Sequence, residues 1–333
     1  MSKAFVEDSA GELEAITIRL AWRQWAAIGG SAASKETWHS IVDPESLILA
    51  SLFLMNREPR IHDILFSWVQ VNAELLSVQH LKNLQKNYPP ALRARVSDFA
   101  RQARTLARHP RWSSLADEGE SDARPPRWNA GRAAAPRMRN TANLMLRLRL
   151  AMGVGTKADV LTVALGSDRP LTVRQLSDNL SYTAVGVRSA VNDLSRAGFI
   201  VSASGKPAAF SAPHAEWSAL LGLRERPLWV AWHLWFALVV DYLSWADTVK
   251  QKSLGDYAID VKLRELLARH ELFSRYAAHE LPPVAFVSEV DDYQGRIQAL
   301  IDWARRQGQR RKFDRVLGKV RARNAEPVEG DEL

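Results

Sequence analysis

The chain has 333 residues, 47% of them hydrophobic and 25% charged, with a formal net charge of +8. This is the composition of a globular protein, and the absence of cysteine excludes disulfides, thiolate zinc sites and cysteine nucleophiles. The basic balance favours a polyanionic partner. The first 20 residues contain no apolar run typical of a secretory signal, so we expect a cytoplasmic protein.

Residues 1–108 predict an N-terminal helical domain. Apolar side chains recur at helical spacing in residues 12–28. Asp43-Pro44-Glu45 is typical of a helix start, with Asp as N-cap and Pro at the first helical position. Further helices are expected over 47–55, 61–71, 77–87 and 91–108, and no alternating strand pattern interrupts them.

Residues 109–140 predict a linker, because they are rich in Pro, Gly, Ser and Arg and poor in aliphatic side chains. Arginines gather in and around this linker: Arg101, Arg104, Arg108, Arg111, Arg124, Arg127, Arg132, Arg137, Arg139, Arg147 and Arg149. The guanidinium fork suits phosphate contacts. The segment is therefore either a phosphate-contacting arm, with Arg137 and Arg139 nearest the next domain, or a solvated linker.

Residues 141–215 predict a central domain of helix, loop, helix, tight turn, helix and hairpin. Thr172 can cap the second helix, and Ser181-Tyr182-Thr183 forms the turn. In the third helix, residues 184–197, the inward stripe is Val187, Val191 and Leu194. Gly198 ends this helix, and a hairpin with its tip at residues 204–207 follows.

The outer side of the third helix carries small and hydrogen-bonding side chains. Arg188 can fork to a guanine and Asn192 to an adenine, the pairings that major-groove geometry favours. Small residues such as Ala184 let a helix lie close to base edges, and Lys206 at the hairpin tip suits a phosphate. The complete set of expected DNA contacts is Thr172, Tyr182, Thr183, Ala184, Arg188, Ser189, Asn192, Lys206, Arg137 and Arg139.

The run LTVRQLSDNLSYTAVGVRSAVNDLSRAGFIVSASGKP resembles the winged helix-turn-helix regulators of the bacterial MarR and ArsR kind. The resemblance implies a mainly α fold in which a central winged helix-turn-helix is flanked by N- and C-terminal helical domains. It also implies a sequence-specific protein that binds double-stranded DNA, a homodimeric transcriptional repressor with room for a small-molecule effector. The alternative is a winged-helix scaffold that mediates protein contacts in a DNA-processing or defence complex.

Residues 216–325 predict a C-terminal helical domain, followed by a tail at 326–333. Tryptophan is abundant here: Trp217, Trp229, Trp232, Trp235, Trp245 and Trp303. We expect these rings in a large buried core, although a ligand pocket or partner surface stays open. The apolar run at 228–240 is shorter than the roughly 20 residues that span a bilayer. A core helix or a dimer interface is expected instead, with no membrane partner.

Three groups of residues have the composition of catalytic or metal sites, but none has the required spacing. His270-Glu271 and His279-Glu280 are nine residues apart, whereas a zinc helix needs histidines four apart. Asp256, Asp260 and Lys262 have the composition of a nuclease site but lie in a helical stretch. Gly153-Val154-Gly155 lacks the third glycine of a nucleotide loop. We therefore expect no catalytic residue, no metal and no cofactor, and a protein that is not an enzyme.

Overall fold

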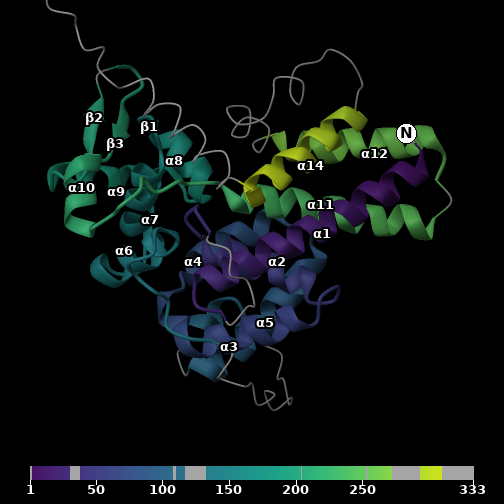
Figure 1. The fold of residues 1–333 in the computed structure, drawn as a ribbon, viewed down its shortest axis with the longest axis horizontal. Coiled ribbons are helices and arrows are strands. Elements are labelled where there is room, and N and C mark those ends of the chain that lie inside the picture. Colours follow the sequence, from purple (N-terminus) through teal and green to yellow (C-terminus); the bar gives the residue numbers. More distant parts are fainter. Residues whose placement is uncertain are drawn as a thin grey trace, which may run out of the picture.

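The computed structural model describes residues 2–30, 38–107, 110–116, 133–203, 205–252, 254–271 and 293–309. Figure 1 shows a mainly helical chain with one small three-stranded antiparallel sheet. The expected mainly α class is confirmed at this level. A search of the described helices finds none with the length and apolar character needed to cross a membrane.

The N-terminal half folds into helices close to the expected places. They are α1 (Lys3–Ala27), α2 (Pro44–Leu54), α3 (Arg60–Asn72), α4 (Val78–Leu84) and α5 (Ala91–Ala107), with short 3-10 turns η1 (Ala73–Leu75), η2 (Gln85–Asn87) and η3 (Pro110–Ser114). The start of α2 is as predicted: the Asp43 carboxylate accepts a hydrogen bond from the Ser46 amide, and Pro44 is the first helical residue.

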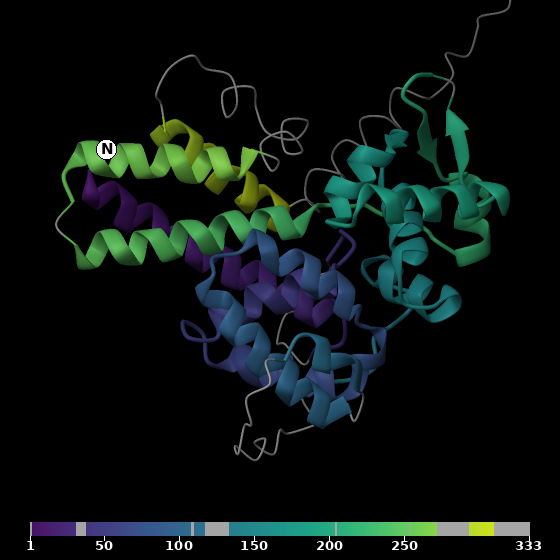
Figure 2. The same ribbon diagram turned by 180° about the vertical axis from the view of Figure 1, so that it is seen from behind.

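The C-terminal helices share one core with the N-terminal helices. These are α11 (Trp232–Gln251), α12 (Asp256–Arg269) and α14 (Tyr293–Gln309), and α11 packs against both α1 and α2. Figures 1 and 2 show α1, α11, α12 and α14 running side by side. The helices α11, α12 and α14, which the sequence predicts to form a separate C-terminal domain, therefore share one hydrophobic core with the N-terminal helices. We call these helices together the helical body.

The tryptophans of α11 lie in the centre of the helical body. Trp232 and Trp235 are fully buried, and the Trp303 ring of α14 lies 5.9 and 5.0 Å from their rings. Trp38 also packs against Trp232, with ring centroids 5.3 Å apart. The expectation of a buried core is confirmed for Trp232, Trp235 and Trp303, whereas Trp229 and Trp245 are partly buried and Trp217 belongs to another core.

The sheet-bearing unit, residues 144–221, has its own hydrophobic core. Its elements are α6 (Leu144–Met152), α7 (Thr156–Gly166), β1 (Leu171–Thr172), α8 (Val173–Leu180), α9 (Ala184–Arg196), β2 (Val201–Ala203), β3 (Ala209–Ser211) and α10 (His214–Leu221). The strand order is β1-β3-β2, antiparallel throughout. The hairpin of β2 and β3 was expected, whereas β1, which pairs Leu171 with Phe210, was not.

Part of the expected linker is built into the helical body. Trp112 is fully buried and meets Phe99 edge to face at 5.6 Å, and Ala133 forms a bridge with Gly30. Residues 117–132, with Arg124, Arg127 and Arg132, lie outside the described residues, as does Arg108.

The helical body and the sheet-bearing unit meet along an extended segment before α2. The Ile41 amide donates to the Leu228 carbonyl at 2.8 Å, and the Trp229 amide donates to the Gly166 carbonyl at 2.9 Å. Gly166 ends α7 so close to Trp229 that an added Cβ would lie 2.6 Å from the Trp229 Cβ. Figure 2 shows the unit beside one end of α11. The two parts are thus held by backbone contacts as well as by side chains.

Candidate nucleic-acid interface

Helix α9 is fixed at both ends by local hydrogen bonds. The Thr183 hydroxyl accepts from the Gly186 amide at 3.2 Å, which satisfies one free amide of the first turn. At the other end Gly198 has φ +73°, and the Phe199 amide returns to the Leu194 carbonyl at 2.9 Å. This left-handed glycine cap is the one predicted from the sequence. The cap also turns the chain toward β2.

The inner and outer sides of α9 are separated as the sequence predicts. Val187, Val191 and Leu194 are buried in the core of the sheet-bearing unit. The outer side carries side chains that the structure leaves exposed: Ala184, Val185, Arg188, Ser189, Asn192 and Arg196. Among the described residues neither the Arg188 guanidinium nor the Asn192 amide has a hydrogen-bond partner. Both are therefore available to a partner molecule.

Thr172 and Lys206, two further expected DNA contacts, flank α9 in the sequence and differ in their surroundings. Thr172 forms a capping box at the start of α8: its hydroxyl accepts from the Gln175 amide, and the Gln175 side chain accepts from the Thr172 amide. Its hydroxyl is thus already engaged within the unit. Lys206 is exposed on the loop between β2 and β3.

Tyr182 does not lie on the outer face, which corrects the expectation for this residue. Its side chain is only 8% exposed, and its hydroxyl donates to Asp159 at 2.8 Å. Its ring lies against the His80 ring, with centroids 5.0 Å apart. The turn therefore points its one large side chain inward, toward partners that are far away in the sequence.

The arginines around the expected linker that the structure describes differ in their surroundings. Arg137 and Arg139 are exposed, but their turn is tied to the end of α1, because Asn143 donates to both the Ala27 and the Arg137 carbonyls. Arg147 donates to the Leu221 carbonyl, and Arg149 is buried. The phosphate-arm interpretation therefore loses Arg149, which is buried and cannot contact a phosphate.

A buried ion network lies directly behind the turn between α8 and α9. At its centre Arg149 of α6 donates to Glu45 at 2.8 and 3.0 Å and to Asp159 at 2.7 and 3.0 Å. A further bond to the Leu75 carbonyl, at 3.1 Å, uses the last guanidinium donor. All five donors of this arginine are thus satisfied, which is the condition under which burying its charge is tolerable.

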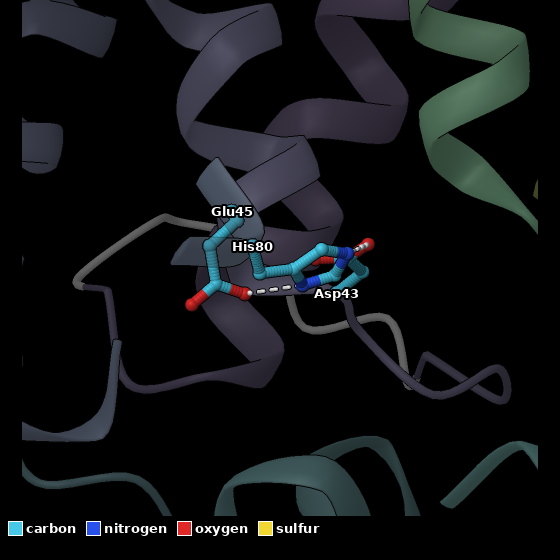
Figure 3. Close-up of side chains that lie close together, drawn as sticks. All are labelled: Asp43, Glu45 and His80. Carbon is cyan, nitrogen blue, oxygen red and sulfur yellow. Dashed lines mark ion pairs between the residues drawn. The ribbon is translucent and has the colours of Figure 1, made fainter. Parts of the chain in front are cut away.

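His80 of α4 occupies the other side of Glu45, between two carboxylates. Figure 3 shows its ring between Glu45 and Asp43. Its Nδ1 lies 3.3 Å from a Glu45 oxygen, and its Nε2 lies 3.9 Å from an Asp43 oxygen. All three side chains are fully buried. Because His80 also stacks on Tyr182, the network connects the helical body to the turn before α9.

The pKa shifts follow from burial and from these neighbours. Burial raises the pKa of Asp43 to about 6, although His80 acts against it. Burial also disfavours the charge of Glu45, but Arg149 and His80 outweigh it and lower its pKa to about 2. For His80, burial is outweighed by Asp43 and Glu45, so its pKa is raised. The network therefore favours a charged His80 beside an ionised Glu45.

Asp43, Glu45 and His80 are also a possible set of metal ligands, since one ligand atom of each lies within 4.8 Å of the others. Two observations argue for an ion-pair arrangement instead. The two imidazole nitrogens face different carboxylates, whereas only one of them can ligate a given ion. Glu45 is already held by Arg149 and by the Ser77 amide. A divalent cation would also compete with the buried guanidinium charge.

The network was not predicted, although its members leave a trace in the sequence. Glu45 is the one charge in the apolar stretch PESLILASLFL. Arg149 and Asp159 lie in the largely apolar stretches LMLRLRLAM and TKADVLTVALG, each of which holds one further charge, Arg147 and Lys157. A charge that a helix buries needs a partner, so such residues can be suspected of pairing. Which charge pairs with which depends on how α2, α6 and α7 meet.

The described residues of the three candidate catalytic groups lie in or beside α7 and α12. Asp256, Asp260 and Lys262 lie on α12, where Lys262 pairs with Glu265. His270 pairs with Asp241, and His279 lies outside the described residues. Gly153 and Gly155 lie in the short connection before α7.

The chain was compared with family models, curated proteins and solved structures. No family model matches it, and none of the curated proteins or solved structures matches it either.

Proposed function

We propose that residues 156–211 form a winged helix-turn-helix and that the chain is a sequence-specific DNA-binding protein. The observation that carries the proposal is the outer face of α9, where Arg188, Ser189 and Asn192 are exposed on a helix whose other side is firmly buried. Supporting it, the order helix, strand, helix, turn, helix, hairpin with strand order β1-β3-β2 is that of a winged helix. In such a module α9 enters the major groove.

The proposed contacts divide into base readout and backbone contacts. Arg188 and Asn192 would read base edges, and Ser189 and Ala184 would lie close to them. Thr183 at the helix start and Lys206 on the hairpin loop would contact the backbone. The net charge of +8 supplies the long-range attraction.

We further propose that the chain acts as a homodimeric transcriptional repressor. Two exposed leucines support a self-association surface: Leu150 of α6 is 57% exposed and Leu220 of α10 is 73% exposed. The two helices are neighbours, since Arg147 donates to the Leu221 carbonyl. A two-fold symmetric operator would follow from such a dimer.

A scaffold role is the second candidate, and one observation favours it. Val185, on the outer face of α9, is 75% exposed, and an exposed apolar side chain beside Arg188 suits a protein partner as well as a thymine methyl group. In this role α9 would dock a protein of a DNA-processing or defence complex.

Selection of bound sequences from random double-stranded DNA tests the first proposal. We expect an enriched motif, and Arg188→Ala and Asn192→Ala should each weaken binding to it by about 1–3 kcal/mol and relax the base preference at one position. Arg93→Ala is the matched control, because Arg93 is exposed on α5 in the helical body. If no DNA sequence is enriched, and if binding to DNA does not weaken as the salt concentration rises, the scaffold role is favoured.

A further inference from the structure

A cleft of about 590 Å³ lies where the helical body meets the turn before α9. Three parts of the chain line it: the end of α4 with η2, the turn between α8 and α9, and the facing sides of α11 and α12. The volume is within the range of small-molecule sites, which often lie between structural units. The cleft shares Tyr182 with the buried ion network but is itself open to solvent.

One wall of the cleft offers hydrogen-bond donors that the protein leaves unused. Lys86 of η2 lines the cleft and is exposed, and its ammonium has no partner in the part of the chain that is described. Asn83, one turn earlier, accepts from Gln79 through its oxygen, so its amide N–H groups face no described acceptor. An ammonium beside an amide donor is suited to a ligand that carries a negative charge.

The cleft also has apolar lining residues. Leu234 and Ala237 of α11 are among them, and Pro89 and Pro90 continue the apolar surface after η2. A ligand that fills the cleft would therefore bury an apolar body against α11 while its charged end meets Lys86. Burial of such a body contributes roughly 25 cal/mol per Å² of apolar surface.

The acidic side chains of the cleft limit the charge of the ligand. Asp241 is balanced by Arg269 and His270, each 3.0 Å away, and Asp178 adds a negative charge to the wall formed by α8. A phosphate dianion meets about twice the repulsion from these carboxylates that a singly charged carboxylate meets.

We propose that this cleft is a binding site for a small organic monocarboxylate with an apolar body. Its carboxylate accepts hydrogen bonds from Lys86 and Asn83, and its apolar part lies against Leu234 and Ala237. The site does not require that the protein binds DNA. Because Ser181 and Thr183 also line the cleft, an occupant touches the residues that begin α9. Any effect on DNA binding would be reciprocal.

The test is calorimetric titration of the full chain, without DNA, with butyrate, benzoate and naphthoate, and with neutral benzamide. Saturable binding is expected to tighten with the size of the apolar body, and benzamide should bind more weakly than benzoate. Lys86→Gln should weaken benzoate and naphthoate about five- to tenfold, the loss of one partly exposed charged hydrogen bond. Lys82→Gln is the matched control, because Lys82 is exposed on α4 but does not line the cleft.

Three results would overturn the proposal. One is the absence of saturable binding for every carboxylate at millimolar concentration. Another is binding that Lys86→Gln leaves unchanged or that Lys82→Gln weakens equally. The third is tighter, Lys86-dependent binding of inorganic phosphate or of a short single-stranded oligonucleotide than of naphthoate. A chain that binds carboxylates but selects no DNA sequence would refute the proposed function and leave the site standing.

Discussion

Arg149 and Glu45 form a two-pronged ion pair across the boundary between the sheet-bearing unit and the helical body. The two N–O distances are 2.8 and 3.0 Å, and both side chains are fully buried. Because Arg149 binds Asp159 as well, it joins α2 of one part to α6 and α7 of the other. The orientation of α9 on the body therefore depends on a charge that water cannot screen.

Replacing Arg149 should break the contact between the helical body and the sheet-bearing unit. We expect Arg149→Met to lower the free energy of unfolding by about 3–5 kcal/mol, because Glu45 and Asp159 would be left as unpaired buried charges. Urea denaturation followed by tryptophan fluorescence measures the change. Arg93→Met, at an exposed position, should stay within about 0.5 kcal/mol of the parent. An Arg149→Met loss as small as that of the control would contradict the buried pair.

Tyr182 and Arg188 should separate stability from DNA binding. Tyr182→Phe removes the hydroxyl that donates to Asp159 and should cost about 1.5–3 kcal/mol of stability, since the hydrogen bond is made to a charged group. The base preference of the folded variant should remain that of the parent. Arg188→Ala should behave in the opposite way, with unchanged stability and weaker DNA binding. The two variants are compared by denaturation and by titration of the selected DNA.

The left-handed cap of α9 can be tested against another glycine of the chain. Gly198 has φ +73° and open space around its Cβ position, so Gly198→Ala should cost about 1 kcal/mol through backbone strain alone. Gly11 lies inside α1, also with open space. Gly11→Ala should therefore stabilise the protein by about 0.5–1 kcal/mol. Thermal unfolding of both variants is the measurement. A change in stability of the same sign in both variants would contradict the assigned cap.

The raised pKa of Asp43 predicts a stability that falls with rising pH. Its folded pKa is about 6 and its ordinary value is 3.8, because burial disfavours the charge. The folded state therefore holds the proton more tightly, and its stabilising effect, present below about pH 4, is lost as the pH rises through about 6. His80, whose pKa is also raised, acts in the same direction at higher pH.

Asp43→Asn tests this effect, together with the part of the His80 shift that Asp43 causes. Asparagine caps a helix as well as aspartate does, so the hydrogen bond from the Ser46 amide is kept. We expect the stability of the variant relative to the parent to rise by roughly 2 to 2.5 kcal/mol between pH 4 and pH 7. Urea titrations at several pH values measure it. A difference that does not change with pH would show that Asp43 titrates near its ordinary value.

Local features of the fold could be predicted from the sequence. The cap at Asp43, the buried stripe of Val187, Val191 and Leu194, and the glycine end of α9 each depend on residues within one or two turns of one another. The hairpin of β2 and β3 is also a short-range structure. β1 escaped prediction because a strand of two residues, Leu171 and Thr172, has no periodicity and exists only through its pairing with β3.

The candidate interface likewise contains some residues that the sequence could place and others that it could not. The exposure of Arg188, Ser189 and Asn192 follows from helical periodicity and the inward stripe of α9, so the sequence alone determined it. The burial of Tyr182 and Arg149, and the common core of α11 with α1 and α2, were decided by tertiary structure. Glu45 lies 104 residues from Arg149 in the chain. Because a buried charge is tolerable only beside its partner, such a residue can be placed only once the packing of distant helices is known.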